Sequence, residues 1–295
     1  MEIRSLSADV GFGVPTFDDI ARAFAAAFAE YEVQISPAEL RTMLRRRGFA
    51  PSLSFAAFTP QGEIAAFTLN GVGGFGGPAA GGVKTAYDTG TGTLPEFRGR
   101  GLATRIFEES LPALRAAGIG QYILEVLRHN TTAVEIYRRM GFGVRREFNY
   151  FRGGGGNGRS DLSYAEYELR RIKITDIQSI AKGFWDFEPS WQNSFEAIER
   201  AASDFIFLGA FDGGRLAGYA VFEPAAGDIT QIAVAHDSRR RGVGSALLGE
   251  MLRLNRAAGL KCLNTEEGRD EALAGFLEAR GVGLAGRQFE MVLQL

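Results

Sequence analysis

The chain has 295 residues, of which 45% are hydrophobic and 23% charged, and its 33 basic and 35 acidic side chains give a formal net charge of −2. The length favours two domains of about 150 residues each, and the composition is typical of a globular protein. The charge balance disfavours a nucleic-acid binder or a polybasic membrane anchor. One cysteine and two histidines exclude an internal disulfide and leave too few ligands for a structural zinc site. The first ten residues contain no apolar run, so we expect no signal peptide.

Apolar periodicity and turn residues predict an α/β domain in the first half of the chain. The expected elements are, in chain order, a strand at Ile3–Leu6, helices at Phe17–Glu30 and Pro37–Arg47, a hairpin of Ser54–Thr59 and Glu63–Leu69, a strand at Val83–Leu94, a helix at Leu102–Ala117, a strand at Tyr122–Val126, a helix at Thr131–Met140 and a strand at Arg146–Phe151. This order is β-α-α-β-β-β-α-β-α-β, and the second half of the chain repeats it.

The repeat is also visible in short matching segments. Arg115–Gly118 returns as Arg256–Gly259, and Arg98–Ala103 returns as Arg239–Gly244, both 141 positions later. Five such matches in the same order indicate two tandem copies of one domain. We place the domains at residues 1–160 and 161–295.

Two glycine-rich segments interrupt this pattern. Arg152–Gly158 contains four successive glycines, which cannot hold regular structure cheaply. It is either an inter-domain linker or a long hairpin loop that precedes a strand within Tyr164–Ile172. Gly71–Gly82, with seven glycines in twelve residues, is either an acceptor-side lid or an ordinary loop.

The segment Phe97–Ala103 lies between a predicted strand and a predicted helix. Glycines there let main-chain N–H groups turn inward at a helix N-terminus, where unpaired donors and the positive end of the dipole bind phosphate. The alternative is a tight strand–helix turn without a ligand. The glycine spacing differs from the patterns of dinucleotide folds and P-loops, and the segment occurs twice at the same place in the repeat.

The sequence resembles the GNAT superfamily of acetyl-CoA-dependent N-acetyltransferases, whose hallmark [Q/R]-x-x-G-x-[G/A] at a β–α junction holds the coenzyme A pyrophosphate. The resemblance covers nearly the whole chain as two copies and implies a mixed β-sheet flanked by helices in each, an α/β (α+β) class, with acetyl-CoA as co-substrate and no metal. It implies as coenzyme-binding residues Thr93, Leu94, Arg98, Gly99, Arg100, Gly101, Leu102, Ala103, Thr104 and Asn130 in the first copy and Arg239, Gly242 and Gly244 in the second.

The first copy also resembles the ribosomal-protein N-terminal acetyltransferases, through Leu124-Glu125-Val126, Asn130, Ala133, Tyr137 and Gly141-Phe142. By this resemblance Tyr137 protonates the departing thiolate and Glu125 is the base. The alternatives are a salt bridge at a strand end for Glu125 and a core aromatic for Tyr137. The backbone of Thr93 and Leu94 would polarise the thioester carbonyl, and Asn130 caps a helix, touches the coenzyme, or does both.

The second copy departs from the pattern. Counting back from Gly281 places Leu277, which cannot donate a proton, at the tyrosine position, with the inert Phe276 beside it. We therefore expect a catalytic first copy and a degenerate second copy. The aromatic and acidic run Phe184–Trp191 is either part of an acceptor site or a hydrophobic plug between domains.

The expected function is acetyl transfer from acetyl-CoA to a primary amine by direct attack. The acceptor is a small-molecule amine or a peptide N-terminus, with no nucleic acid or membrane involved. The alternative is a non-catalytic acyl-CoA-binding or sensing protein. The single cysteine favours a cytoplasmic location, and the chain acts as a monomer or a homodimer.

Overall fold

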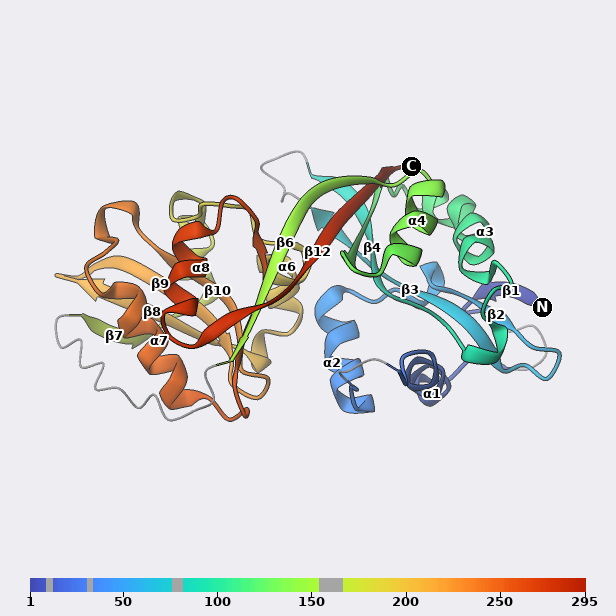
Figure 1. Cartoon of the computed structure of the whole chain (residues 1–295), viewed down its shortest axis with the longest axis horizontal. Coiled ribbons are helices and arrows are strands. Elements are labelled where there is room, and N and C mark those ends of the chain that lie inside the picture. The colour runs from blue at the N-terminus through green and yellow to red at the C-terminus, as the bar shows by residue number, and fades with distance from the viewer. Residues whose placement is uncertain (9–12, 31–33, 76–81, 154–166) are drawn as a thin grey trace. The chain divides into compact units, whose positions relative to one another are not determined.

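The computed structural model describes residues 1–8, 13–30, 34–75, 82–153 and 167–295. Contacts divide the chain into two units (Figure 1). The N-terminal unit contains Met1–Arg145 together with Glu290–Leu295, and the C-terminal unit contains Arg146–Phe289. Residues 154–158 of the predicted glycine-rich segment lie outside the described residues.

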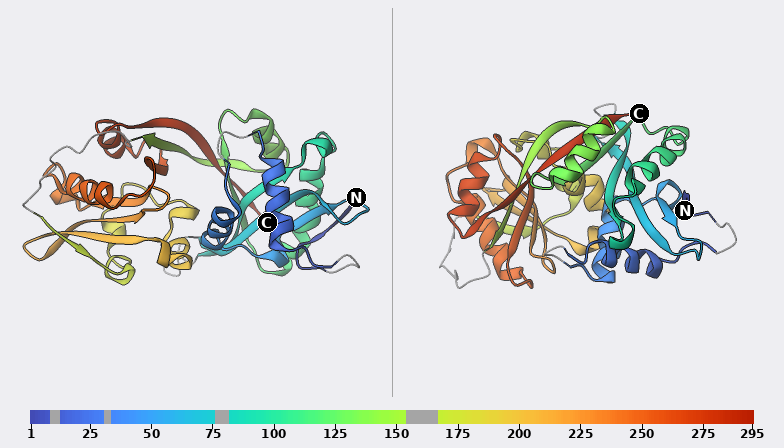
Figure 2. Two further views of the ribbon diagram at one scale, coloured as in Figure 1. Left: turned by 90° about the horizontal axis from the view of Figure 1, so that it is seen from below. Right: turned by 45° about the vertical axis from the view of Figure 1, so that its right-hand side comes forward.

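The N-terminal unit is a twisted sheet with helices on both faces (Figure 2). Its elements are β1 (Glu2–Ser5), α1 (Phe17–Ala27), α2 (Pro37–Arg47), η1 (Pro51–Leu53), β2 (Phe55–Phe58), β3 (Ile64–Phe75), β4 (Val83–Thr93), η3 (Pro95–Phe97), α3 (Leu102–Ala116), β5 (Gln121–Leu127) and α4 (Thr131–Arg139). The strand order is β1-β2-β3-β4-β5 and then the end of β12. Neighbours from β1 to β4 pair antiparallel, and β4 pairs parallel with β5.

The C-terminal unit repeats this architecture. Its elements are β6 (Gly143–Gly153, from Arg146 onward), β7 (Glu168–Arg171), α5 (Ile174–Ile177), η4 (Ala181–Gly183), η5 (Trp191–Asn193), α6 (Phe195–Arg200), η6 (Ala202–Asp204), β8 (Ile206–Asp212), β9 (Arg215–Glu223), β10 (Asp228–Val234), η7 (His236–Ser238), α7 (Val243–Leu254), β11 (Leu260–Glu266), α8 (Glu271–Glu278) and β12 (Val282–Gln294). The strand order is β12-β6-β11-β10-β9-β8-β7. The predicted β-α-α-β-β-β-α-β-α-β order is therefore confirmed in both copies.

Local signals explain where the first helices begin and end. The Thr16 and Ser36 side chains cap α1 and α2, and Asp19 and Glu39 complete a capping box at each. Gly48 ends α2 in the left-handed conformation, with φ 79°. These signals lie within a few residues of each helix end, so they are readable from the sequence.

The last strand of each sequence copy pairs outside that copy. Strand β6 ends the first copy, yet it pairs with β11 of the C-terminal unit, with Phe151 opposite Cys262. Conversely, the end of β12 belongs to the N-terminal unit, where the Leu295 N–H donates to the Gly120 carbonyl at 3.0 Å. The contact boundary accordingly falls between Arg145 and Arg146. Figure 1 shows β6 and β12 running side by side.

Each sheet buries apolar side chains on both faces. In the N-terminal unit α1 and α2 pack against Phe67 and Leu69, whereas α3 packs against Ala57, Ala65 and Ala66 on the other face. In the C-terminal unit α7 and α8 cover one face, and α5 and α6 cover the face that carries Tyr219 and Val221.

Strand β3 is longer than the sequence predicts. The expected loop begins at Gly71, but β3 continues to Phe75, which lies opposite Val83 of β4. A Cβ on Gly71 would lie 2.0 Å from the Arg47 carbonyl oxygen, so this glycine permits the end of α2 to approach the strand. The remainder of the expected loop, residues 76–81, lies outside the described residues.

Each unit has one β-bulge in the middle of its sheet, at equivalent positions. Thr89 is an extra residue in β4 relative to β3, and Thr230 is an extra residue in β10 relative to β9. Pairing of β4 with β5 runs from Thr85↔Gln121 to Tyr87↔Ile123, and the β10–β11 register is Asp228↔Lys261. Bulges bend strands and redirect side chains, so each unit gains a gap between its two parallel strands.

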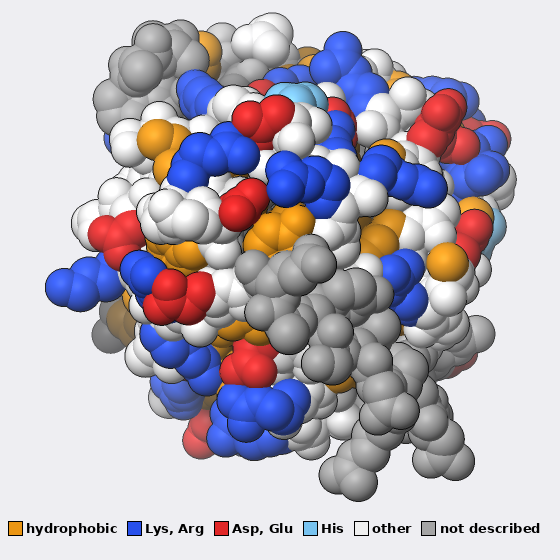
Figure 3. Space-filling view, turned by 90° about the vertical axis from the view of Figure 1, so that its left-hand side faces the viewer, with side chains coloured by type: hydrophobic (Ala, Val, Ile, Leu, Met, Phe, Trp, Pro, Cys, Tyr) orange, Lys and Arg blue, Asp and Glu red, His pale blue; other side chains and the backbone are white. Residues whose placement is uncertain are grey.

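Basic and acidic side chains intermingle on the face shown in Figure 3, in keeping with a formal net charge of −2. Among the described residues, no helix has both the length and the apolar character that a membrane span requires.

Candidate functional site

Each unit contains a cavity where its two parallel strands separate. The N-terminal cavity, of about 180 Å³, is lined by residues of β4, α3, β5 and α4. The C-terminal cavity, of about 790 Å³, is lined by the equivalent elements β10, α7, β11 and α8 and by the segment from Phe184 to Pro189. Ligand sites in proteins commonly measure about 300–1,000 Å³, so the C-terminal cavity is of ligand size without rearrangement.

The predicted glycine loop of the N-terminal unit leads directly into α3. Gly99 and Gly101 have φ angles of 73° and 68°, and a Cβ on either would meet nothing within 4 Å. These glycines are therefore required by backbone conformation rather than by close packing. Gly101 precedes the first turn of α3, whose residues Leu102, Ala103 and Thr104 present main-chain N–H groups without helical partners.

The arginine that begins each loop folds back onto its own unit. The Arg98 guanidinium donates to the carbonyls of Thr93 and Ala27 and pairs with Glu30 at 2.6 Å. The Arg239 guanidinium donates in the same way to the carbonyls of Val234 and Phe184 and pairs with Asp186 at 2.9 Å. Both side chains therefore hold the loop in place against the rest of the unit. Arg100 donates to the Glu96 carbonyl.

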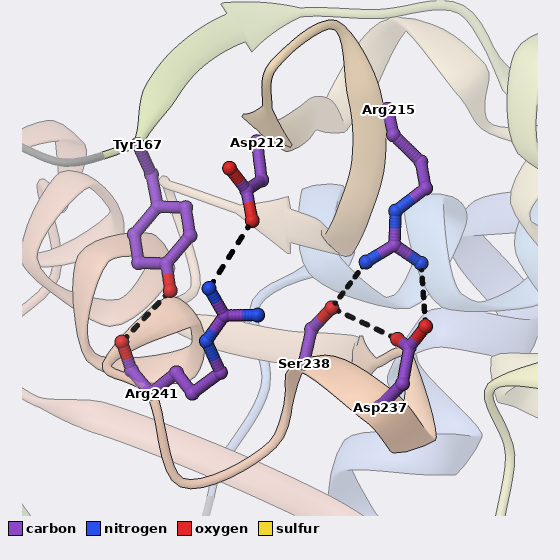
Figure 4. Close-up of polar contacts among 6 residues, drawn as sticks. All are labelled: Tyr167, Asp212, Arg215, Asp237, Ser238 and Arg241. Carbon is purple, nitrogen blue, oxygen red and sulfur yellow. Dashed lines mark hydrogen bonds and ion pairs between the residues drawn. The ribbon is translucent and has the colours of Figure 1, made fainter.

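Further contacts fix the loop of the C-terminal unit (Figure 4). The Tyr167 hydroxyl donates to the Arg241 carbonyl at 2.9 Å, and Arg241 pairs with Asp212 at 3.4 Å. Arg215 pairs with Asp237 at 2.7 Å and holds the pKa of that carboxyl below its usual range. Gly242 begins α7 with φ 91°. These contacts hold the loop on both sides.

Tyr137 lies on α4 with its side chain in the N-terminal cavity. Its hydroxyl donates to Oδ2 of Asp88 at 3.2 Å, and its ring makes an edge contact with Phe142 at 5.7 Å between centroids. The Asn130 side chain caps α4 by accepting from the Ala133 N–H, and Asn130 also lines the cavity. The cap therefore fixes the helix that carries Tyr137 into the cavity.

Asp88 is a site residue that the sequence reasoning missed. It lies on β4 beside the bulge at Thr89, and it accepts hydrogen bonds from the hydroxyls of Thr91 and Tyr137. Burial raises the pKa of the Asp88 carboxyl to about 6, against the opposing effect of those hydrogen bonds. The available signal was a single acid within the otherwise uncharged segment Thr85–Thr93. The bulge, which decides where that acid points, left no signal in the sequence.

Glu125 does not share the cavity of Tyr137. Tyr122 of β5 lines that cavity, and because side chains alternate along a strand, Glu125 lies on the opposite face. There Glu125 lies beside the buried Tyr87, and together with burial it raises the pKa of the Tyr87 hydroxyl. The Arg47 guanidinium lies 5.8 Å from the centre of the Tyr87 ring. The structure therefore gives the two predicted catalytic residues different surroundings.

Thr93 and Leu94, whose backbone is predicted to polarise the thioester carbonyl, also have different surroundings. Thr93 lines the cavity, as does Ala103. The Leu94 N–H, however, donates to the Ala65 carbonyl at 3.0 Å, which engages it within the sheet.

In the C-terminal unit Phe276, rather than Leu277, occupies the place of Tyr137. Phe276 lines the C-terminal cavity, whereas Leu277 is 0% exposed and lies in the core. Other residues of α4 that line the N-terminal cavity also have counterparts in α8, each the same number of positions later in the chain as Phe276 is after Tyr137. The matched lining pairs are Ala133 with Ala272, Ile136 with Gly275, Tyr137 with Phe276, and Met140 with Ala279. The count from Gly281 is thus corrected by one residue, because the turn after α8 is one residue longer.

The partner of Tyr137 is replaced too. Asp88 precedes the bulge residue Thr89, and Ile229 precedes the equivalent Thr230, where it is 0% exposed. The C-terminal unit therefore lacks both the hydroxyl and the carboxylate of the N-terminal cavity at those positions.

Most of the aromatic run, from Phe184 to Pro189, lines the C-terminal cavity. The Trp185 Nε1–H donates to the Tyr219 hydroxyl at 2.6 Å, and that hydroxyl donates to Oε1 of Gln231 at 2.8 Å. Gln231 in turn donates to the Asn193 carbonyl at 2.6 Å. This part of Phe184–Trp191 therefore forms a cavity wall whose polar groups are bonded to one another.

No cluster of three or more His, Cys, Asp or Glu side chains placed to hold a metal ion occurs in the part of the chain that the structure describes. Cys262 is buried and lines the C-terminal cavity, where burial raises the pKa of its thiol above the usual value.

Comparisons with known proteins bear on both units. The sequence profile of the acetyltransferase (GNAT) family matches residues 18–142 and 172–282. Among curated proteins, no sequence matches significantly. A GCN5-related N-acetyltransferase from Sphaerobacter thermophilus is similar in structure, with TM-score 0.72 and 15% identity over 99% of this chain and 95% of that one.

Two other solved structures share this similarity. A tandem GNAT protein from the clavulanic acid biosynthesis pathway has TM-score 0.68 and 16% identity over 99% of this chain and 98% of its own. A putative acetyltransferase from Pyrococcus horikoshii has TM-score 0.66 and 14% identity over 100% of this chain and 89% of its own. At these identities the likeness establishes a common two-domain fold.

Proposed function

The chain belongs to the acetyltransferase (GNAT) family, and from this premise we propose that its N-terminal unit transfers an acetyl group from acetyl-CoA to a primary amine. The observation that supports this proposal is the hydrogen bond between Tyr137 and Asp88 in a cavity that also borders the start of α3. A proton donor and an anion-binding helix start are the two features that direct transfer from a coenzyme thioester requires.

The coenzyme's pyrophosphate would be held by main-chain N–H groups of the loop from Gly99 to Thr104, which lies open at its glycines. Its thioester end would lie beside Thr93, Asn130 and Tyr137, which line the N-terminal cavity. When bound, the coenzyme supplies an acetyl group activated as a thioester. The loops of both copies, including Arg239, Gly242 and Gly244, are proposed as coenzyme-binding loops.

The chain's own groups must move two protons. A C–N bond forms and a C–S bond breaks, so the amine nitrogen loses one proton and the sulfur gains one. Tyr137 is the proposed donor to sulfur. Two carboxylates are candidates for the acceptor: Glu125, on the sheet face beside Tyr87, and Asp88, in the cavity itself.

Asp88 has one advantage as the proton acceptor. With a pKa of about 6 it is ionised at neutral pH and holds a proton only briefly. A proton that it accepts from the amine lies within hydrogen-bond distance of the Tyr137 oxygen, so Asp88 can restore the donor after each turnover. Glu125 acts as base if the amine approaches from the opposite face of the sheet.

We further propose that the acceptor is a small-molecule amine or a peptide N-terminus, and that the protein acts in the cytoplasm as a monomer or homodimer. The cytoplasmic placement rests on the single cysteine, Cys262, which is buried.

A second function, non-catalytic binding of an acyl-CoA, is favoured by one observation. The larger cavity, of about 790 Å³, belongs to the unit in which Phe276 and Ile229 replace the tyrosine and the aspartate. Such a unit is equipped to bind and not to transfer.

The two functions are separated by thiol release from acetyl-CoA. The full chain is incubated with acetyl-CoA and a panel of amines that includes polyamines, amino acids, aminoglycosides and short peptides. An enzyme releases free thiol faster with its acceptor than without, and Tyr137→Phe removes that increment. Equal thiol release with and without every amine, at saturating acetyl-CoA, would establish the binding function instead.

A further inference from the structure

Two matched helix positions carry smaller side chains in the larger, C-terminal cavity. Ile136 and Met140 of α4 face the N-terminal cavity, and the equivalent residues of α8 are Gly275 and Ala279. A Cβ built on Gly275 would meet nothing within 4 Å. The volume is therefore open where the first copy places long side chains.

One wall of the C-terminal cavity is basic. Arg240 and Arg280 line it together with Ser245, which lies in the first turn of α7. Arg280 donates to the Ser245 hydroxyl and to the Phe276 carbonyl, so its guanidinium lies at the start of that helix. Arg240 adopts a left-handed conformation with φ 60°, at the position that Gly99 holds in the first copy. Positive charge at a helix start suits a pyrophosphate.

The opposite wall is neutral. Trp185, Tyr219 and Gln231 form it with the hydrogen bonds described above, and their polar atoms satisfy one another. Burial raises the pKa of the Tyr219 hydroxyl above its usual value, which keeps it uncharged. The carboxylate of Asp186, which follows Trp185 in the chain and also lines the cavity, pairs with Arg239. A charged group placed against this wall would lose its hydration without a partner.

Since Phe276 and Ile229 remove the acid and its partner, the space beyond the separated strands is not needed for an acceptor amine. A ligand with its phosphates on the basic wall has room there for a longer tail. We propose that the C-terminal cavity is a non-transferring site for a coenzyme A thioester whose acyl group is uncharged and several carbons longer than acetyl. This inference rests on the proposed function, because it takes this family member to bind coenzyme A thioesters.

The chain offers its own reporter for this site. It has two tryptophans, of which Trp185 lines the cavity and Trp191 is buried elsewhere, 2% exposed. In a Trp191→Phe background, fluorescence therefore reports ligand binding beside Trp185. Titrations use coenzyme A, acetyl-CoA, butyryl-CoA, succinyl-CoA and hexanoyl-CoA without any amine. Calorimetry on the wild type, fitted with one site in each unit, checks the constants of the Trp185 site without a substitution.

Each buried methylene raises affinity roughly fourfold. We therefore expect hexanoyl-CoA to bind at least about tenfold more tightly than acetyl-CoA at the Trp185 site. Butyryl-CoA should bind at least about tenfold more tightly than succinyl-CoA, which has the same number of acyl carbons but ends in a carboxylate.

The matched variant gives α8 the residues of α4. Gly275→Ile with Ala279→Met fills the cavity, and we expect it to abolish the tenfold preference for hexanoyl-CoA and the Trp185 response. Each single substitution is also measured, in case the double variant does not fold as judged by its circular dichroism and thermal unfolding.

Equal affinities for acetyl-CoA and hexanoyl-CoA, or a preference retained in the filled variants, would overturn the inference. Acetyl-CoA binding by calorimetry and thiol release that depends on Tyr137, with no Trp185 response to any of the five ligands, would overturn it and leave the proposed function standing. If none of the five ligands binds the wild type by calorimetry, the proposed function fails along with it.

Discussion

The Tyr137 hydroxyl donates to Oδ2 of Asp88 at 3.2 Å, and so joins α4 to a strand 49 positions earlier in the chain. The two residues are replaced together in the C-terminal unit, by Phe276 and Ile229. This joint replacement is what we expect of a pair that works as a unit, since neither group keeps its role without the other.

Replacing Tyr137 by Phe should lower kcat by roughly 10²–10⁴, the usual contribution of a general acid. Coenzyme affinity should change little, because the ring and its contact with Phe142 remain. Steady-state kinetics and calorimetric binding measure the two effects. Tyr150→Phe, which removes a tyrosine hydroxyl outside the N-terminal cavity, is the control, and a similar loss in both variants would contradict the assignment.

Activity should depend on pH through Asp88. Below about pH 6 this carboxyl is protonated and accepts no proton, so log kcat/KM should rise with pH through about 6 and then level. Asp88→Asn should remove that limb and lower the plateau. Profiles are taken with two amines of different pKa, because a limb that shifts with the amine belongs to the acceptor. If log kcat/KM of Asp88→Asn still rises through about pH 6 with both amines, this pH dependence belongs to another group of the enzyme.

The same residue should affect stability. The pKa of Asp88 is about 6 in the folded protein against 3.8 in the unfolded chain, so the folded state binds more protons between these values. Stability therefore falls as pH rises from about 4 to 6. Asp88→Asn should raise the free energy of unfolding at pH 8 by on the order of 3 kcal/mol, and have little effect at pH 3.5, as measured by urea denaturation.

Asp19→Asn is a contrasting control of opposite sign. The capping hydrogen bonds from Thr16 lower the pKa of Asp19, so its contribution is present at neutral pH and lost as pH falls. We expect Asp19→Asn to destabilise the protein at pH 8 more than at pH 3. If both variants shift stability in the same direction at pH 8, the account of Asp88 is wrong.

Gly101→Val should weaken coenzyme binding to the N-terminal unit by tenfold or more. The substitution strains a backbone with φ 68° and places methyl groups at the mouth of the loop. Gly118→Val is matched, because Gly118 has φ 74° and equally open surroundings but lies at the far end of α3. Calorimetry on both variants separates strain from ligand contact, and equal losses in the two would argue against the loop.

Glu125→Gln tests the base on the other face of the sheet. If Glu125 accepts the proton, kcat should fall by roughly 10²-fold or more for every amine. If Glu125 only contacts Tyr87 and accepts no proton, the rate should stay near that of the wild type. The rise of log kcat/KM through about pH 6, which we assign to Asp88, should then be unchanged. A large loss in Glu125→Gln combined with a wild-type profile in Asp88→Asn would exchange the two roles.

The sequence alone determined the features that local chemistry encodes. The order of elements in both copies, the capped start of α2 at Ser36 and the left-handed glycines at Gly101 and Gly242 all follow from residues a few positions apart. The repeat and the loop were likewise readable, since glycine is the residue that adopts a left-handed backbone at the least cost.

Only the tertiary structure decided what those elements bring together. The bulge at Thr89 depends on the register with β3, and it sets which side of the sheet receives Asp88 and which receives Tyr87. The pairing of β6 with β11 and the openness of the cavity at Gly275 likewise depend on distant partners. Periodicity within a strand cannot reveal these features, because a one-residue shift in pairing exchanges the two faces of a sheet.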